Sequence, residues 1–193
     1  MSQMNQKQLW DETYSNDGRM WRGNSRIPLP IQSGRALDLG CGNGKTVSTL
    51  LDGGLDVTGI DFSSKAVESC RSIFGDKAEF IESDISDLPF DDSSFDYVTA
   101  VHILEHIDEE GMHQASDEIR RVLKPGGYLF IRSFAPGDLR ESKRTDGILY
   151  IHRTPEQIVA YLPKLEVISS ELVEERTRFG AVRCRSECLL RRI

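Results

Sequence analysis

The stretch Arg35-Ala-Leu-Asp-Leu-Gly-Cys-Gly-Asn-Gly-Lys45 joins a short apolar run to three closely spaced glycines. The apolar run predicts a fully buried parallel strand. Glycine at positions 40, 42 and 44 lets the backbone turn sharply and approach a ligand closely. The helix expected over residues 45–51 begins at this turn, and helix N-termini favour anionic groups. The stretch therefore predicts a ligand site at the carboxyl end of a strand.

The glycine spacing separates two classes of nucleotide-binding protein. The dinucleotide fingerprint G-x-G-x-x-G needs a glycine at position 45, which is Lys45, whereas the third glycine of this chain is Gly44. This spacing opposes an NAD-linked oxidoreductase. The pattern Asp38-x-Gly40-x-Gly42-x-Gly44 instead resembles the first motif of the class I S-adenosylmethionine-dependent methyltransferases, in which an acid and G-x-G-x-G end the first strand.

Later segments follow in the order that this family needs. We expect strands over residues 55–60, 78–82, 95–101 and 128–134, and helices over residues 63–74 and 111–123. The segment Lys124-Pro-Gly-Gly127 should stop the second helix and turn the chain into the fifth strand. Leu-Lys-Pro-Gly-Gly before that strand also resembles the methyltransferase family, so the resemblance covers residues 36–134.

The C-terminal part predicts a helix and a closing hairpin. Thr154 and Pro155 form a helix start, and residues 165–174 and 182–190 read as two long antiparallel strands. The resemblance implies an α/β, Rossmann-like seven-stranded sheet of order 3-2-1-4-5-7-6, with strand 7 antiparallel and helices on both faces. We expect one methyltransferase domain over 1–193: an arm or lid at 1–34, a cofactor-binding core at 35–134, and an acceptor side at 135–193.

The resemblance implies S-adenosylmethionine as cofactor and S-adenosylhomocysteine as product. The glycine-loop residues expected to bind it are Asp38, Gly40, Cys41 and Gly42. Asp61 and Phe62 follow the second strand, where a carboxylate can accept hydrogen bonds from both ribose hydroxyls. The alternative is that Asp61 caps the helix at 63–74, although Ser63 or Ser64 would serve equally well.

Residues after the third and fourth strands complete the predicted cofactor site. In the family, an acid after the third strand binds the adenine amino group and the next apolar residue flanks the ring. Asp84 and Ile85 match these positions, and Asp87 competes with Asp84. Val101 is expected to contribute backbone contacts near the methionine end of the cofactor.

His102 is the candidate catalytic base. It opens the segment His102-Ile-Leu-Glu-His106 directly after the fourth strand, and an imidazole can accept a proton at neutral pH. Read literally, His-x-x-Glu-His is the inverted zinc-protease pattern. Its position after a parallel strand instead matches the Leu-Glu-His of many methyltransferases, so we expect no metal. His106 is expected to be structural.

Several aromatic and polar residues are candidates for a lid or an acceptor pocket. Trp10 and Tyr14 form an aromatic stripe in the helix expected over 3–14, and Trp21 follows in a glycine-bounded loop. They either pack on the core or close over the ligand. At the other end of the chain, His152, with Arg132, Ser133 and Tyr150, either lines the acceptor pocket or lies in solvated loops.

Charge and missing motifs restrict the acceptor. Lys and Arg number 24 against 31 Asp and Glu, a net charge of −7, which disfavours nucleic acid and anionic membranes. The Asn/Asp-Pro-Pro-Tyr/Phe motif and a cysteine after the fourth strand are both absent, which disfavours adenine and cytosine-C5 chemistry. We expect methyl transfer to an O, N, S or C nucleophile on a small molecule. Alternatives are a protein or tRNA acceptor presented with a partner subunit, and a non-catalytic cofactor-binding regulator.

The remaining expectations concern compartment and partners. No apolar run reaches the ~18 residues that span a bilayer, and no apolar leader opens the chain, so we expect a cytoplasmic protein without a membrane partner. The four cysteines lack framework spacing and suit a reducing compartment. A small activating subunit or a homodimer is possible. An arginine cluster near the C-terminus is either a solvated face or a site for an anionic acceptor or a partner; its members are Arg176, Arg178, Arg183, Arg185, Arg191 and Arg192.

Overall fold

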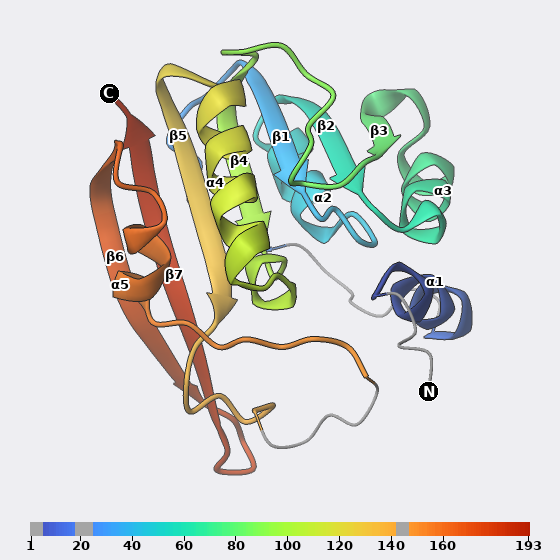
Figure 1. The fold of residues 1–193 in the computed structure, drawn as a ribbon. Helices are drawn as coiled ribbons and strands as arrows, with labels where there is room; N and C mark the ends of the chain where they lie inside the picture. Colours follow the sequence, from blue (N-terminus) through green and yellow to red (C-terminus); the bar gives the residue numbers. More distant parts are fainter. Residues whose placement is uncertain (1–5, 18–24, 142–146) are drawn as a thin grey trace.

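The computed structural model describes residues 6–17, 25–141 and 147–193. They form a seven-stranded sheet of order β3-β2-β1-β4-β5-β7-β6 (Figure 1). Neighbouring strands are parallel from β3 to β5, whereas β7 is antiparallel to both β5 and β6. The strands are β1 (Arg35–Leu39), β2 (Asp56–Asp61), β3 (Glu79–Glu82), β4 (Phe95–Val101), β5 (Leu123–Phe134), β6 (Leu165–Arg176) and β7 (Val182–Arg192). The predicted strand order and the antiparallel strand 7 are confirmed.

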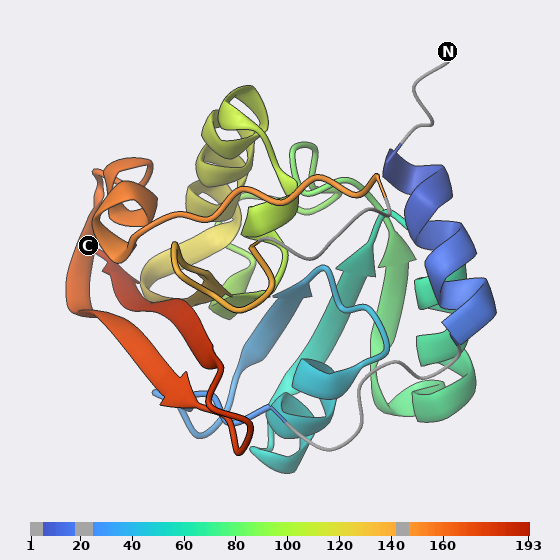
Figure 2. The same cartoon turned by 90° about the horizontal axis from the view of Figure 1, so that it is seen from below.

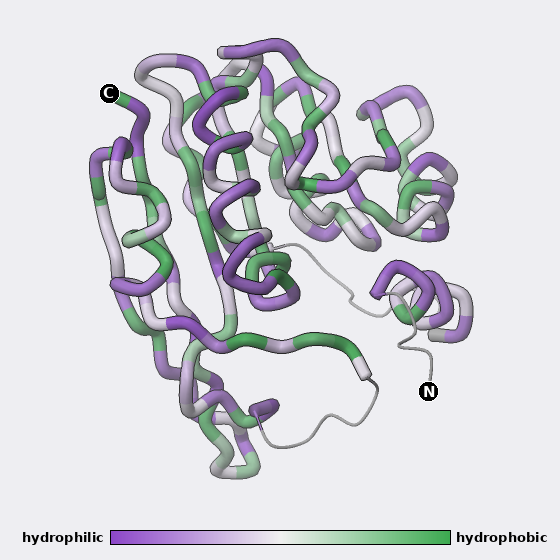
Figure 3. The backbone as a smooth tube through the Cα atoms, in the orientation of Figure 1, coloured by the Kyte–Doolittle hydropathy of each residue, from purple (hydrophilic) through white to green (hydrophobic). Residues whose placement is uncertain are grey.

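Helices cover both faces of the sheet, as Figure 2 shows. The α-helices are α1 (Gln6–Asp17), α2 (Lys45–Asp52), α3 (Ser64–Phe74), α4 (Glu109–Val122) and α5 (Pro155–Ala160), with short 3₁₀ turns η1 (Gly75–Lys77) and η2 (Leu104–His106). Buried side chains of α4 and α5 pack on one face, and those of α2 and α3 pack on the other. Figure 3 shows the result: the central strands are mainly hydrophobic, and the helices, such as α4 in front of the sheet, carry hydrophilic residues on their outward side.

Local capping signals explain where two helices begin. The hydroxyl of Ser63 accepts a hydrogen bond from the amide of Ala66, so Ser63, and not Asp61, caps α3. Thr154 and Gln157 form a reciprocal capping box at α5, with Pro155 in the first turn. The prediction that a helix begins at Thr154 is confirmed. The alternative that Asp61 caps α3 is wrong.

The helix stop expected before residues 124–127 is confirmed, since α4 ends at Val122, but these residues belong to β5 and do not form a separate turn. Strand β5 begins at Leu123, immediately after α4, because Leu123 pairs with Phe95 of β4. The register shifts between Phe95 and Tyr97, and Gly126 has a φ of 79°, so the extra residues form an irregularity within the strand. The Pro-Gly-Gly signal therefore marks a bulged strand start and not a separate turn.

Strand β6 differs from the expected alternation of buried and exposed residues. Almost all of its side chains are exposed on both faces. It is the outer strand of the sheet and pairs on one side only, with β7. The predicted hairpin exists, but its outer strand is held by main-chain pairing more than by burial.

Candidate functional site

The glycine loop between β1 and α2 has the backbone that only glycine adopts easily. Gly42 and Gly44 have φ values of 51° and 78°. A Cβ on Gly44 would lie 2.2 Å from Cε2 of Phe74, and one on Gly42 would lie 2.8 Å from Oη of Tyr14. Glycine is therefore needed both for the turn and for the close approach of α3 and α1.

Asp61 holds this loop in place. Its Oδ2 accepts a hydrogen bond from the amide of Gly42 at 2.9 Å, and its Oδ1 accepts one from the amide of Ser63 at 2.9 Å. Burial raises the pKa of Asp61 to about 6 even though the two amides lower it. The carboxylate lines a cavity of about 470 Å³. It can therefore fix the loop and also face a bound ligand.

Asp38 occupies a different position from the other acids. It is 2% exposed, accepts a hydrogen bond from Thr99 at 2.7 Å, and does not line either of the two cavities described here. Burial raises its pKa to about 7. Asp38 therefore links β1 to β4, and the structure does not place it among the residues that line the predicted cofactor site.

The 470 Å³ cavity collects the residues predicted for the nucleoside. Asp61, Phe62, Asp84 and Ile85 all line it, whereas Asp87 is not among its lining residues. The Oδ1 atom of Asp84 accepts hydrogen bonds from the amide and hydroxyl of Ser86 at 2.9 and 2.7 Å. These contacts orient an exposed carboxylate at the mouth of the cavity.

A larger cavity of about 700 Å³ adjoins the first one. Gly40, Cys41, Gly42 and Val101 line it, so four of the five cofactor residues predicted from the ends of β1 and β4 meet there, without Asp38. The two cavities share the lining residues Trp10, Tyr14, Gly40, His102 and His106. A ligand that fills both would therefore pass His102.

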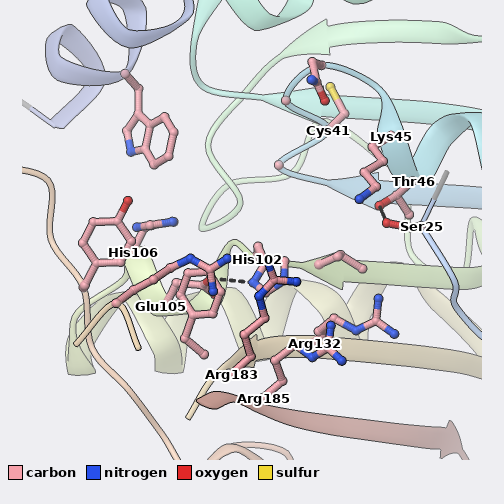
Figure 4. Close-up of a pocket in the computed structure, with 18 of the residues that line it drawn as sticks. Ser25, Cys41, Lys45, Thr46, His102, Glu105, His106, Arg132, Arg183 and Arg185 are labelled. Carbon is pink, nitrogen blue, oxygen red and sulfur yellow. Dashed lines mark hydrogen bonds and ion pairs between the residues drawn. The ribbon is translucent and has the colours of Figure 1, made fainter. Parts of the chain in front are cut away.

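His102 is held by a buried carboxylate (Figure 4). Its Nδ1 lies 2.9 Å from Oε1 of Glu105, which is fully buried, and the other oxygen of Glu105 accepts from the Ser133 hydroxyl at 2.9 Å. Burial alone raises the pKa of Glu105, but the charge and hydrogen bond of His102 bring it down to about 2. The ring of His102 also packs on Phe134, with centroids 4.4 Å apart.

The backbone at His102 is strained. Its φ is 59°, in the left-handed region that non-glycine residues rarely adopt. Its amide donates to the carbonyl of Arg132 at 2.7 Å, so β5 holds this conformation. Such strain occurs preferentially at functional sites. It turns the chain out of β4 and presents the imidazole to both cavities.

Helix α1 bridges the site. Asp11 accepts a hydrogen bond from Ser63 at 2.5 Å, and Lys7 pairs with Glu82, which joins α1 to the β2–β3 side. Gln6 exchanges hydrogen bonds with Gly147 and Leu149 on the other side. Figure 1 shows α1 beyond the carboxyl ends of the parallel strands. This placement agrees with the lid hypothesis for Tyr14, whereas Trp21 lies outside the described residues.

The second histidine of the motif has a structural setting. The Nδ1 of His106 lies 2.8 Å from the carbonyl of Leu149, and its ring meets Trp10 and Tyr150 edge-on at 4.9 and 4.6 Å. His106 ends the 3₁₀ turn η2, and His102 lies before that turn, so the two histidines do not share a long helix. In the described part of the chain, no group of three or more His, Cys, Asp or Glu could hold a metal ion.

The remaining candidates for the acceptor pocket lie in different places. Arg132 and Tyr150 line the larger cavity, whereas Ser133 is buried against Glu105. His152 lines a third hollow and reaches the larger cavity only through a stacked contact with Phe134, at 6.2 Å between centroids. The structure therefore does not bring His152 together with His102.

Two features were missed by the sequence reasoning. The motif alone does not assign a role to Glu105, although an acid three residues after a histidine indicates a possible pair with His102. Arg183 and Arg185 were grouped with four other arginines, but only these two of the six line the larger cavity. Their position depends on the register of β7, which the sequence does not state.

The comparisons agree with this geometry. The model of a methyltransferase domain matches residues 37–131. The chain belongs to the class I S-adenosylmethionine-dependent methyltransferases. The cofactor of this family is the one expected from the glycine motif. No helix in the described ranges is long and apolar enough to cross a membrane.

Individual relatives of this methyltransferase differ in what they act on. A demethylmenaquinone methyltransferase of Clavibacter sepedonicus is 39% identical over 61% of this chain and 48% of its own length. A tRNA N(3)-methylcytidine methyltransferase of Drosophila melanogaster is 28% identical over 80% of this chain and 55% of its own. A solved S-adenosylmethionine-dependent methyltransferase of Methanosarcina mazei aligns with a TM-score of 0.73 and 27% identity, over 84% of this chain and 94% of that one. The chain spans about half the length of these two curated relatives.

Proposed function

We propose that this methyltransferase transfers the methyl group of S-adenosylmethionine to a nucleophile on a small molecule. The observation that carries the proposal is the pair of adjoining cavities with His102 in the lining of both. One cavity has acids suited to a nucleoside, and the other is large enough for a second ligand. A transfer reaction needs its two substrates side by side at one point.

The residues of the smaller cavity and the glycine loop would hold the cofactor. Asp61 would accept from the ribose hydroxyls and Asp84 from the adenine amino group, with Phe62 and Ile85 against the ring. Gly40, Cys41, Gly42 and Val101 would face the methionine end. The cofactor supplies a methyl group made electrophilic by a positive sulfur, so the protein has to align the acceptor and exclude water.

His102 would take the proton that the acceptor loses. With its Nδ1–H donated to Glu105, the lone pair of a neutral ring is on Nε2, which is then the proton acceptor. The buried carboxylate of Glu105 would stabilise the imidazolium that forms. This is an arrangement in which a base is oriented by a third group.

A small acceptor fits this site better than a macromolecule. Trp10 and Tyr14 of α1 line both cavities, so the helix covers the place where a nucleic acid or protein chain would enter. The net charge of −7 also opposes a polyanion. We place the reaction in the cytoplasm because all four cysteines are free thiols. We also propose that residues 1–193 form a single methyltransferase domain. An activating subunit or a homodimer remains compatible with this site.

The test combines cofactor binding with methyl uptake. Calorimetry measures S-adenosylhomocysteine binding, and labelled-methyl cofactor is then incubated with a cell extract separated into small-molecule, protein and RNA fractions. We expect binding by the wild type and label in the small-molecule fraction. Label in the protein or RNA fraction would overturn the small acceptor, and binding without label in any fraction would indicate a regulator.

The role of His102 is tested by His102→Asn against the control His113→Asn. His113 lies on α4, faces Tyr161 and lines the third hollow. A lost general base costs about 10²- to 10⁴-fold in kcat, so His102→Asn should lose that much while its cofactor affinity stays the same. His113→Asn should keep its activity. Equal activity of the two variants would show that no base acts at position 102.

A further inference from the structure

The larger cavity is strongly basic although the protein is acidic. Six Arg and Lys side chains line it against two Glu, in a chain of net charge −7. The cations come from opposite sides of the cavity. Figure 4 shows Lys45 on the side of the glycine loop, with Arg132, Arg183 and Arg185 across from it. The cavity therefore has an electropositive wall on the side away from the glycine loop.

The fold places this wall beside His102. Strand β7 is antiparallel to β5, so it begins where β5 ends, and Arg185 pairs with Phe134 in the ladder. Arg183 lies two residues earlier and on the same face of the strand. Phe134 in turn packs on His102. Arg183 and Arg185 thus lie at the acceptor side of the proposed base, beyond the half of the sheet that holds the cofactor residues.

Protein carboxylates leave part of this charge unmatched. Arg132 pairs with Glu187 at 2.8 Å and Arg140 with Asp138 at 3.3 Å. Arg185 lies 3.5 Å from Glu175 through an outer nitrogen. Its Nε lies 3.8 Å from Glu187, which Arg132 already engages more closely. Arg183 has no ion pair with any of the described residues.

Two buried donors also lack acceptors. The Nε atoms of Arg183 and Arg185 are buried, and neither has a hydrogen-bond partner in the described ranges. Buried polar groups in folded proteins are almost always hydrogen-bonded. Guanidinium groups hold carboxylates and phosphates with two parallel hydrogen bonds, so an oxyanion is the ligand that fits both donors.

We propose that Arg183 and Arg185 form an anion-binding subsite that recognises a carboxylate or phosphate group on the methyl acceptor. The inference rests on the proposed function, because it assigns the substrate class to that same site. The anion would anchor the acceptor on β7 and leave its nucleophile beside His102. Lys45, which directly follows Gly44, is left on the opposite side for the carboxylate of the cofactor.

The test uses small probes that differ in charge. Benzoate, phenyl phosphate and neutral benzyl alcohol are titrated by calorimetry into the full chain, with and without saturating S-adenosylhomocysteine. Benzoate or phenyl phosphate should bind at least about tenfold more tightly than benzyl alcohol, since a charge-assisted hydrogen bond is worth that much or more. Whichever of the two anions binds more tightly identifies the acceptor group as carboxylate or phosphate.

Variants separate the subsite from general electrostatics. Arg183→Gln and Arg185→Gln should each weaken the anion about tenfold or more, and Arg183→Lys should lose less. The matched control is Arg178→Gln, which removes the same charge from the same hairpin at an exposed position stacked on Phe179. It should leave anion affinity unchanged. Circular dichroism melting checks that every variant is folded.

Three results would overturn the inference. One is equal binding of the anions and benzyl alcohol by the wild type. Another is an equal loss of anion binding in Arg178→Gln and Arg183→Gln. The third is a loss of S-adenosylhomocysteine affinity in Arg183→Gln, which would assign the arginine to the carboxylate of the cofactor. Failure of the wild type to bind S-adenosylhomocysteine would instead refute the proposed function, and the titrations without it would still decide the subsite.

Discussion

Replacing Glu105 with glutamine should destabilise the protein in a pH-dependent way. The ordinary pKa of a glutamate is 4.5. Burial raises the pKa of Glu105, but the charges of His102 and His106, the hydrogen bond with His102 and a backbone hydrogen bond lower it to about 2. At ~1.4 kcal/mol for each unit of pKa difference, this lowering of the pKa corresponds to about 3 kcal/mol of folding free energy. Because the folded pKa is the lower one, the contribution is complete above pH 4.5 and is lost as the pH falls towards 2.

Urea unfolding followed by circular dichroism measures this effect at pH 7, 5, 4 and 3. At pH 7, Glu105→Gln should unfold with about 3 kcal/mol less free energy than the wild type, and the gap should narrow below pH 4.5. The control Glu166→Gln changes the same group at an exposed position on β6 and should stay within about 0.5 kcal/mol. A gap that is absent at pH 7, or that does not change with pH, would refute the ion-pair argument.

Three further predictions concern stability. Gly44→Ala should cost about 1–3 kcal/mol more in thermal unfolding than Gly180→Ala, because both glycines have φ near 80° but only Gly44 has a ring in the way, that of Phe74; equal costs would remove the steric argument. Asp38→Asn should abolish a loss of wild-type stability that builds up as the pH rises from about 4 to about 7, because the pKa of Asp38 is raised from 3.8 to about 7. About 3 kcal/mol of this loss falls between pH 5 and pH 8; a wild-type free energy of unfolding that changes between these two pH values no more than that of the variant would contradict this. Thr154→Ala should cost about 1 kcal/mol through the lost cap, and an unchanged urea midpoint would show that the cap contributes nothing.

Local signals account for the parts of the site that the sequence predicted. The glycine loop, Asp61 and Asp84 follow parallel strands directly, and the carboxyl ends of such strands meet at one edge of a sheet. Their grouping therefore follows from strand order alone. The N-caps Ser63 and Thr154 could also be predicted, because capping depends on residues three positions apart.

Features that depend on pairing between distant strands could not be predicted from the sequence. The start of β5 at Leu123 depends on a ladder with Phe95 that absorbs a bulge, and the Pro-Gly-Gly signal predicts a turn equally well. The burial of Glu105 depends on Ser133 from β5 and on His102 from the end of β4. The spacing of three residues indicates that Glu105 can pair with His102, but it does not indicate that the carboxylate is buried.

The electropositive wall of the larger cavity shows how the direction of β7 determines which side chains line the site. In a sheet that was parallel throughout, the residues at the start of β7 would lie at the amino edge, away from the glycine loop. Because β7 runs against β5, Arg183 and Arg185 arrive at the carboxyl edge, next to Phe134 and the proposed base. The β1–β3 half of the edge carries the acids suited to a nucleoside, and the β5–β7 half carries an excess of cations, of which Arg183 has no ion pair among the described residues. This division of charge along one edge gives the two substrates different binding sites before either makes contact with His102.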